Sequence, residues 1–549
     1  MTKAITKNTL FYGDNLPILR DYVPDESVDL VYLDPPFNSK RTYNVLFKYE
    51  SGEESEAQIA AFEDTWHWDH ATAALYEELV TQTSDEVSRM IAALREFIGT
   101  NQMMAYLVMM TARLVELHRV LKPTGSLYLH CDPTASHYLK ILLDAVFNPT
   151  GFRAEIIWKR SSAHSDARQG SKQPGRIHDI IFFYSKSNEW IWNTVYTEYD
   201  LEYVESNYRY VEEETGRRFK ATDLTAAKPG GDTSYEWKGR KPTKGRFWAY
   251  SRENMQKFDQ EGRLYYTRTG LPRLKQYLDE MPGVPLQDIW LDIPPISSQA
   301  KERLGYPTQK PLTLLERIIE ASSNPGDIVL DPFCGCGTTI AAAQKLGRKW
   351  IGIDITHLSI ALQKYRLQEM FPDASFDVIG EPESVRSAQQ LAQDDRFQFE
   401  WWALSLIKAM PSGSDDGKKG KKGADKGIDG TITFMDDNTG RPKRIVVQVK
   451  SGKVGSGQIR DLVGTVDREK AVMGVFITLE TPSKPMLTEA ASAGFYHSPG
   501  WNQNYPKIQI LTIEALLNGS QVQMPPTGMT FKQAQRVQEP GPQQKSLFD

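Results

Sequence analysis

The sequence predicts an α/β protein: a Rossmann-like sheet carrying a long insertion, followed by a second, smaller α/β domain. Three observations lead to this fold class. Two short apolar runs, 28–33 and 327–330, each end at an aspartate, as buried parallel strands do where they reach a ligand-binding loop. The helix and strand periodicity fades between about 159 and 291, and a new pattern of helices and strands begins at residue 397.

Length and composition narrow the class of protein. A chain of 549 residues is too long for one core, so two or three domains are expected. A net charge of -5 and a pI near 6.1 exclude a protein that coats nucleic acid indiscriminately. The three cysteines cannot form a disulfide framework and fall short of a closed zinc site. Neither a signal peptide nor a membrane span is predicted, so a cytoplasmic location is expected.

The first half of the chain reads as alternating strands and helices. The strand Val28 to Leu33 is stopped by two prolines, and a polar, aromatic stretch from about 39 to 100 follows as an insertion or lid. The elements expected after it are a helix from Met103 to Leu121, a strand from Ser126 to His130, a helix from Ser136 to Phe147, and strands from Ala154 to Trp158 and from Ile180 to Tyr184.

Basic and aromatic residues gather in the insertion that follows. The cations form two clusters, Lys159, Arg160, Arg168, Lys172 and Arg176, and Lys238, Arg240, Lys241, Lys244 and Arg246, among the aromatic residues Trp158, Trp237, Phe247, Trp248 and Tyr250. Such runs are often merely solvated surface. Interleaved with aromatic rings, they favour contacts to a nucleic-acid backbone together with stacking on bases.

A βαβ unit is expected after the insertion. It contains a helix through Leu314 and Ile318, a strand from Asp327 to Leu330, a glycine loop, a helix from Thr338 to Leu346, a strand from Trp350 to Ile353 and a helix to about Met370. The predicted domains are 1–380, with the insertion at about 159–291, a linker at 381–396, a small α/β domain at 397–519 and a disordered tail at 520–549.

The glycine loop, Asp331 to Thr339, has the properties of a nucleotide-like site. Gly335 and Gly337 allow a ligand to approach the backbone N–H groups at the start of a helix. No lysine stands where a triphosphate-binding loop needs one, and Asp354 ends the next strand, where a carboxylate can bind ribose hydroxyls. An adenosine compound is therefore the expected ligand, and a merely tight turn is the alternative.

The tetrapeptide Asp34-Pro35-Pro36-Phe37 suits chemistry on an exocyclic amino group. The lone pair of such a nitrogen is delocalised into the ring, and acceptors for its two hydrogens would aim it at an electrophile. Asp34 and the Pro35 carbonyl could be those acceptors, and Phe37 could stack on an extruded base. A turn without catalysis is the alternative for the tetrapeptide alone.

Together these motifs resemble the DNA amino-methyltransferases of the β arrangement, including the modification subunits of type III restriction systems. The resemblance covers about 10–370. It is carried by Gly13-Asp14-Asn15, by Asp34-Pro35-Pro36-Phe37, by Tyr306-Pro307-Thr308-Gln309-Lys310-Pro311, by the glycine loop and by Asp354. The catalytic motif comes before the cofactor loop, which is the order that defines this arrangement.

The resemblance implies S-adenosylmethionine as methyl donor and double-stranded DNA as substrate. The implied catalytic residues are Asp34, Pro35, Pro36 and Phe37, and the implied cofactor contacts are Asp14, Thr308, Gln309, Lys310, Pro311, Asp331, Phe333, Gly335, Gly337, Thr338 and Asp354. Aspartate at position 34 favours adenine N6 as the target, with cytosine N4 left open. The insertion would recognise the target sequence, and a homodimer is a further expectation.

The C-terminal block offers a second candidate centre. In the run Arg444 to Lys450, Gln448 and Lys450 share one face of a strand, as they also would in an ordinary surface strand. With Asp429 at another strand end and Glu400 on a helix, they could hold Mg²⁺ and an attacking water.

This block resembles the Mrr-like branch of the PD-(D/E)xK endonucleases. The resemblance implies that Asp429 and Gln448 bind metal, Lys450 positions or activates water and Glu400 assists. The combination predicts a restriction-modification protein that methylates DNA and cuts it. The alternative is a lone methyltransferase whose C-terminal block only binds or targets DNA.

The last residues, Gln544 to Phe548, resemble the peptide by which bacterial replication proteins bind the sliding clamp, although short motifs also arise by chance. A bacterial or phage protein is expected.

Overall fold

The computed structural model describes residues 7–36, 68–161, 174–231, 233–297, 300, 302–304, 306, 309–411, 427–436 and 442–526. The chain forms two compact units, of which one is 193–288 and the other joins the sequence before and after it. Several predicted features lie outside the described residues, namely Phe37, Thr308, Arg168 and Lys172 of the first basic cluster, and the peptide Gln544 to Phe548.

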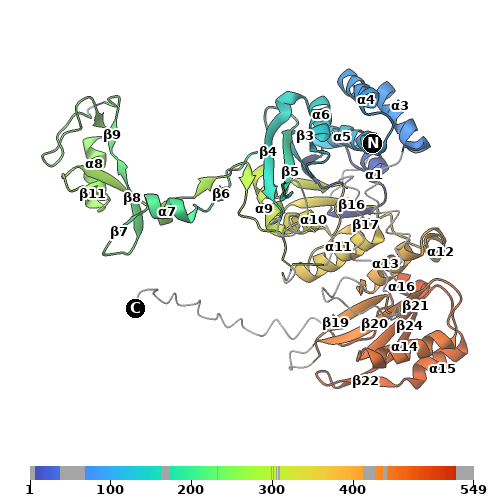
Figure 1. The fold of residues 1–549 in the computed structure, drawn as a ribbon. Helices are drawn as coiled ribbons and strands as arrows, with labels where there is room; N and C mark the ends of the chain where they lie inside the picture. Colours follow the sequence, from blue (N-terminus) through green and yellow to red (C-terminus); the bar gives the residue numbers. More distant parts are fainter. Residues whose placement is uncertain are drawn as a thin grey trace. The chain divides into compact units, whose positions relative to one another are not determined.

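A nine-stranded sheet forms the centre of the larger unit (Figure 1). Its strands, in spatial order, are β14 (Ile289–Trp290), β4 (Phe152–Lys159), β5 (His178–Ser185), β3 (Leu121–Cys131), β2 (Val28–Leu33), β15 (Ile328–Asp331), β16 (Lys349–Asp354), β1 (Thr9–Tyr12) and β17 (Asp377–Ile379). The strands from β3 to β17 run parallel, and β5 is antiparallel to both neighbours. The predicted α/β fold class is confirmed.

The central pair of this sheet is β2 with β15, where Leu30 lies opposite Val329. Both strands are almost wholly buried, so the one charge inside β2 needs partners. The Asp29 carboxylate accepts hydrogen bonds from the Ile328 N–H at 2.9 Å and from Lys122 Nζ at 2.8 Å. This aspartate therefore ties the two halves of the sequence together below the strand ends.

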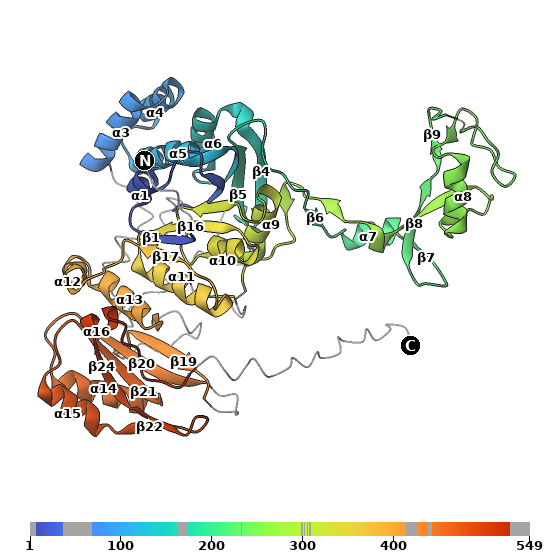
Figure 2. The same ribbon diagram turned by 180° about the vertical axis from the view of Figure 1, so that it is seen from behind.

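Helices cover both faces of the sheet (Figures 1 and 2). One group is α1 (Asn15–Tyr22), α5 (Gln102–Val120) and α6 (Ser136–Phe147), and the other is α9 (Leu312–Ser322), α10 (Thr338–Lys345) and α11 (His357–Met370). Part of the predicted lid belongs to this core, because residues 70–98 form α3 (His70–Gln82) and α4 (Asp85–Ile98), which pack on α5 and α6. Tyr76 and Ile91 are buried there, which gives these helices an apolar face.

The unit 193–288 is shorter than the predicted insertion, because β5 belongs to the main sheet. Its largest sheet has the order β11 (Leu264–Tyr266), β12 (Pro272–Tyr277), β8 (Arg218–Asp223) and β7 (Tyr210–Val211), and its core gathers around Trp237 and Trp248. These two rings are buried, as is Trp158 in β4. The expectation that they stack on bases is therefore wrong, since each ring is taken up by packing.

The C-terminal block is a five-stranded sheet in the order β18 (Met410–Pro411), β19 (Gly430–Phe434), β20 (Lys443–Lys450), β21 (Met473–Thr478) and β24 (Ile508–Thr512). Helices α14 (Ser456–Arg468) and α15 (Lys484–Ser492) pack on one face through Ile459 and Met486. The other face packs against α13 (Arg396–Leu406) and α16 (Ile513–Leu517). Strand β20 is thus buried on both faces and is not a surface strand.

Two segments expected to be unstructured carry order. The predicted linker 381–396 contains α12 (Val385–Asp394), which starts at a capping box between Ser384 and Ser387 and places Ala388 in the core. The first residues of the predicted tail contact the C-terminal domain, where Gln523 and Gln509 form two hydrogen bonds of 2.8 Å. Across the described chain, no helix is long and apolar enough to cross a membrane.

Candidate active site

The two predicted motifs meet at one edge of the sheet. Asp34 directly follows β2, and Asp331 is the last residue of the neighbouring strand β15. Because the two strands are parallel, their carboxyl ends lie side by side, which is where open α/β sheets bind ligands. Residues about 300 positions apart in the sequence therefore share one site.

Asp34 is held by Lys310, from the segment 306–311. Lys310 Nζ and Asp34 Oδ2 form a close ion pair, and both side chains are largely buried. The other oxygen, Oδ1, is buried without a hydrogen-bond partner among the described residues. A buried carboxylate oxygen that is left unpaired is costly unless a ligand supplies a donor.

The glycine loop is shaped by its two glycines. Gly335 and Gly337 have φ of +48° and +74°, a region that side chains rarely adopt. The Gly335 N–H donates to Asp354 Oδ2 at 2.9 Å, and its carbonyl accepts from Gln363 Nε2 at 2.8 Å. Gly337 is the N-cap of helix α10, so the loop presents a helix start at the strand ends.

Two buried carboxylates line this edge. Burial raises the pKa of Asp331 to about 7 and that of Asp354 to about 6. Asp331 accepts from the Phe333 N–H at 3.0 Å, and Asp354 Oδ1 accepts from the Thr356 N–H at 2.9 Å. Both carboxylates are therefore sensitive to a cationic ligand, which would favour their ionised forms.

The Gly13-Asp14-Asn15 motif closes the site from β1. Asp14 caps α1 through the Leu16 N–H at 2.9 Å and accepts from Arg113 Nη2 at 2.7 Å. Asn15 Nδ2 donates to the Pro332 carbonyl at 2.7 Å, which links α1 to the glycine loop. Arg113 is a buried cation on α5 that the sequence analysis missed. The sequence did contain a signal for it: an arginine within an apolar helix pattern indicates a buried charge, and a buried charge requires partners.

The residues of the segment 306–311 make different contacts. Tyr306 lies over Gly335, since a Cβ on that glycine would be 3.2 Å from the tyrosine ring. The Gln309 amide is bonded to the Leu304 N–H at 2.8 Å and to the Glu302 carbonyl at 2.6 Å. Gln309 thus shapes its own loop, while Lys310 reaches the catalytic edge.

Comparison with known families supplies the context for this geometry. The sequence profile described as DNA methylase, of the N6 and N4 methyltransferases, matches residues 28–362, more than half of the chain. The chain belongs to the DNA methylase family. Its methylase region contains β2, β15, the glycine loop and Lys310.

Three named relatives show how far the similarity extends. The type II methyltransferase M.EcaI of Enterobacter cloacae is 31% identical over 64% of this chain and 68% of its own length. The Mod subunit of the type III enzyme StyLTI of Salmonella typhimurium is 25% identical over 62% of this chain, but the match spans only 50% of that subunit. The DNA adenine methyltransferase YhdJ of Escherichia coli is 25% identical over 65% of this chain and 82% of its own length.

In the C-terminal domain of the methylase, the predicted nuclease residues meet only in part. Lys450 Nζ lies 3.6 Å from Asp429 Oδ2, which also accepts from the Val449 N–H at 2.6 Å. The Gln448 side chain donates to the Gly427 carbonyl. Glu400 lies on α13. Among the described residues, no three His, Cys, Asp or Glu side chains form a metal-binding group.

Residues 413–518 of this domain match the family described as NACHT-associated inactive Restriction Endonuclease 1. The restriction-endonuclease-like character of the block is therefore supported, but the expected nuclease activity and Mg²⁺ are not. A neutral Gln448 in place of an acidic ligand, beside an Asp429 that is paired with Lys450, gives a physical reason.

The glycine loop generates a stability prediction. In Gly337→Ala a Cβ would lie 2.6 Å from Gln363 Cγ, and moving that side chain would break its bond to Gly335. Gly347 has a similar φ of +71° with no atom within 4 Å, so Gly347→Ala isolates the backbone cost. We expect Gly347→Ala to lower the free energy of unfolding by about 1 kcal/mol and Gly337→Ala by roughly 1–3 kcal/mol more. Urea unfolding measures both, and equal losses would contradict the packing argument.

Proposed function

We propose that this methylase transfers a methyl group from S-adenosylmethionine to an exocyclic amino group of a base in double-stranded DNA. The observation that carries the proposal is the buried Oδ1 of Asp34, which has no hydrogen-bond partner among the described residues and lies beside the glycine loop and Asp331. Adenine N6 is the favoured target, supported by the likeness to the adenine methyltransferase YhdJ. Cytosine N4 is the second candidate, because both amino groups have the same hydrogen geometry.

The residues of the site suit this cofactor. Its sulfonium supplies an electrophilic methyl group when it is bound. At the ends of β15 and β16, the Asp331 carboxylate would accept the cofactor ammonium group and the Asp354 carboxylate would accept the ribose hydroxyls. Gly335 and Gly337 let the cofactor approach the loop backbone. Phe333 and Thr338 complete the loop, and Pro311 starts α9 behind it.

Asp34 would act on the target base. Its Oδ1 accepts one amino hydrogen, and the Pro35 carbonyl accepts the other, so that the nitrogen lone pair points towards the methyl group. Lys310 fixes the orientation of the Asp34 carboxylate through their ion pair. After transfer the nitrogen carries an extra proton, which Asp34 takes and passes to solvent. Lys310 is thus a positioning residue for Asp34 as well as a neighbour of the cofactor.

The first test is Asp34→Asn in the full-length chain. The amide keeps the shape of the side chain but cannot take the proton, so methyl transfer should fall by at least about a hundredfold. Tritium transfer from labelled S-adenosylmethionine to DNA measures the rate. Calorimetric binding of the cofactor should stay within about twofold of the wild type, because Asp34 contacts the base. A variant with wild-type methyl transfer would refute the assigned role.

The second test is the pH dependence of cofactor binding. The pKa of Asp331 is about 7, and only its ionised form pairs with the cofactor ammonium group. Cofactor affinity should therefore rise by about an order of magnitude between pH 6 and pH 7.5, because the carboxyl loses its proton over this range. The Asp354 pKa of about 6 extends the decline to lower pH. Calorimetry at these pH values measures the change, and Asp331→Asn should flatten it. A wild-type affinity independent of pH would contradict the linkage.

The unit 193–288 is the proposed target-recognition region. Its second basic cluster is partly engaged within the unit, since Lys238 pairs with Asp259 at 2.6 Å and Arg246 with Asp223 at 3.4 Å. Exposed cations such as Lys244 remain suited to phosphate contacts. Because Trp237 and Trp248 lie in the core, partly exposed rings such as Tyr250 would be the ones that stack on bases.

For the C-terminal block we propose the non-cleaving alternative, a DNA-binding or targeting module. The likeness to an inactive endonuclease family supports it, together with the pairing of Asp429 by Lys450. A restriction-modification context remains part of the proposal. Binding to a second copy of the chain, binding of Gln544 to Phe548 to a sliding clamp, and a cytoplasmic location stay predictions.

A cleavage assay separates the two alternatives. Wild-type protein incubated with Mg²⁺ should leave both unmethylated and methylated plasmid intact, because the neutral Gln448 stands where an acidic metal ligand would be needed. Gel electrophoresis detects nicking and cutting. Cleavage by the wild type that is lost in Lys450→Ala would overturn the non-cleaving proposal and restore the nuclease. Cleavage that persists in Lys450→Ala indicates a contaminating nuclease.

A further inference from the structure

Helix α13 carries apolar side chains on two faces. Phe399, Trp402 and Ala403 lie in the core of the C-terminal domain. Phe397 and Trp401 instead belong to a separate apolar cluster. Residues four apart share one face of a helix, so Phe397 and Trp401 point together away from the C-terminal core. The helix is therefore packed on both sides.

The second cluster is built from the methylase domain. Its buried members besides Trp401 are Leu304, Tyr306, Cys336, Leu358 and Leu362. Cys336 is part of the glycine loop, and Tyr306 is the ring that lies over Gly335. Trp401 is 6% exposed. Among the described residues, it is the one buried member of this cluster that comes from α13. A side chain of the endonuclease-like domain thus supports the back of the cofactor loop.

Polar contacts fix α13 in the same place. The His357 N–H donates to Gln398 Oε1 at 2.6 Å, and His357 begins α11 next to Thr356, which is bonded to Asp354. Lys364 Nζ donates to Ser405 Oγ at 3.4 Å. These bonds attach both ends of α13 to the helix that follows the ribose-binding strand end.

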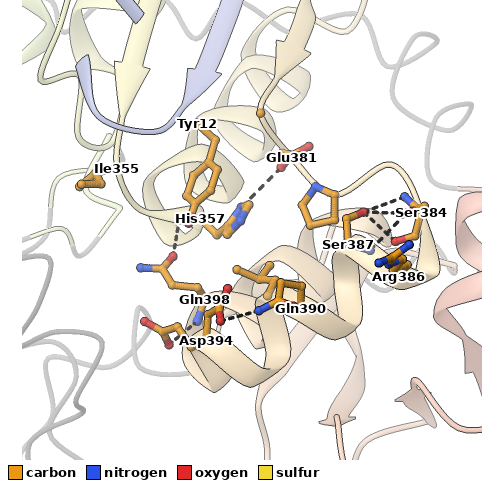
Figure 3. Close-up of a pocket in the computed structure, with 14 residues that line it drawn as sticks. Tyr12, Ile355, His357, Glu381, Ser384, Arg386, Ser387, Gln390, Asp394 and Gln398 are labelled. Carbon is orange, nitrogen blue, oxygen red and sulfur yellow. Dashed lines mark hydrogen bonds and ion pairs between the residues drawn. The ribbon is translucent and has the colours of Figure 1, made fainter. Parts of the chain in front are cut away.

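A cavity of about 700 Å³ lies beside this attachment (Figure 3). Its walls come from both regions, with Tyr12, Ile355 and Glu381 at strand ends of the methylase sheet and Gln390, Asp394 and Gln398 on α12 and α13. Ile355 directly follows Asp354. The C-terminal helices therefore border the strand ends at which the cofactor is proposed to bind.

We propose that Trp401 is a positioning residue of the cofactor site, supplied by the endonuclease-like domain. It holds Tyr306 and the glycine-loop residue Cys336 in place and so couples the C-terminal domain to cofactor binding. The coupling is reciprocal, because a contact that favours the bound form of the loop is itself favoured by the ligand. The inference rests on the proposed function only through the identity of the cofactor.

The test uses the full chain and S-adenosylmethionine. Trp401→Ala should weaken cofactor binding by about tenfold and raise the KM for the cofactor by a similar factor, with kcat changed by less than about twofold. Trp401→Phe should restore most of the affinity, because it refills the apolar cluster. The control is Met486→Ala, which opens a cavity in the far cluster of the same domain and should leave cofactor affinity unchanged.

Hydrogen exchange gives a second readout that needs no variant. In the wild type, saturating cofactor should slow exchange of the α13 amides more than that of the α14 amides. Wild-type affinity in Trp401→Ala would overturn the inference, and so would α13 exchange that ignores the cofactor. Equal loss of affinity in Met486→Ala would also overturn it, by showing a general effect of instability. A wild-type chain that binds no S-adenosylmethionine would contradict the proposed function instead.

Discussion

The parallel pairing of β2 with β15 is the constraint on which the site depends. It places the end of one strand, with Asp34, beside the end of another, with Asp331, although the intervening chain contains four strands of the sheet and the whole unit 193–288. The buried Asp29 carboxylate strengthens this pairing by binding the backbone of β15 and Lys122. A charge at this position is tolerated only because it is fully paired. Everything that the site does chemically follows from the two strand ends being neighbours.

Burial then sets the electrostatics of the edge. Asp34, Asp331 and Asp354 converge where little solvent reaches them, and desolvation raises the pKa of Asp331 and Asp354. Lys310 compensates one of these charges by pairing with Asp34. A site that gathers carboxylates in this way is suited to a cationic cofactor, whose charge replaces the solvation that the carboxylates have lost. The same arrangement leaves Asp34 Oδ1 as the acceptor without a partner in the described structure.

Helix α13 changes how the two halves of the protein are understood. A methylase joined to a nuclease-like domain by a disordered linker would work as two independent parts. Here the expected linker contains α12. Helix α13 packs into the C-terminal core through Trp402 and into the apolar cluster of Tyr306 and Cys336 through Trp401. A domain that matches an inactive endonuclease family can then have a structural part in methylation without any chemistry of its own.

The sequence determined the elements and the motifs. The strand Val28 to Leu33 and the helix Ser136 to Phe147 were predicted with the observed bounds, because uninterrupted burial and clear stop signals leave a local pattern. The family followed from the order of the motifs. Tertiary structure alone decided which residues meet: Lys310 with Asp34, Arg113 with Asp14, and Trp401 with the cluster behind Gly335. The burial of Trp237 and Trp248 was also beyond the sequence, since an aromatic residue among cations has the same pattern in a core as on a binding surface. Local periodicity reports which side of an element is buried, whereas the partner across the contact is fixed only when distant segments pack together.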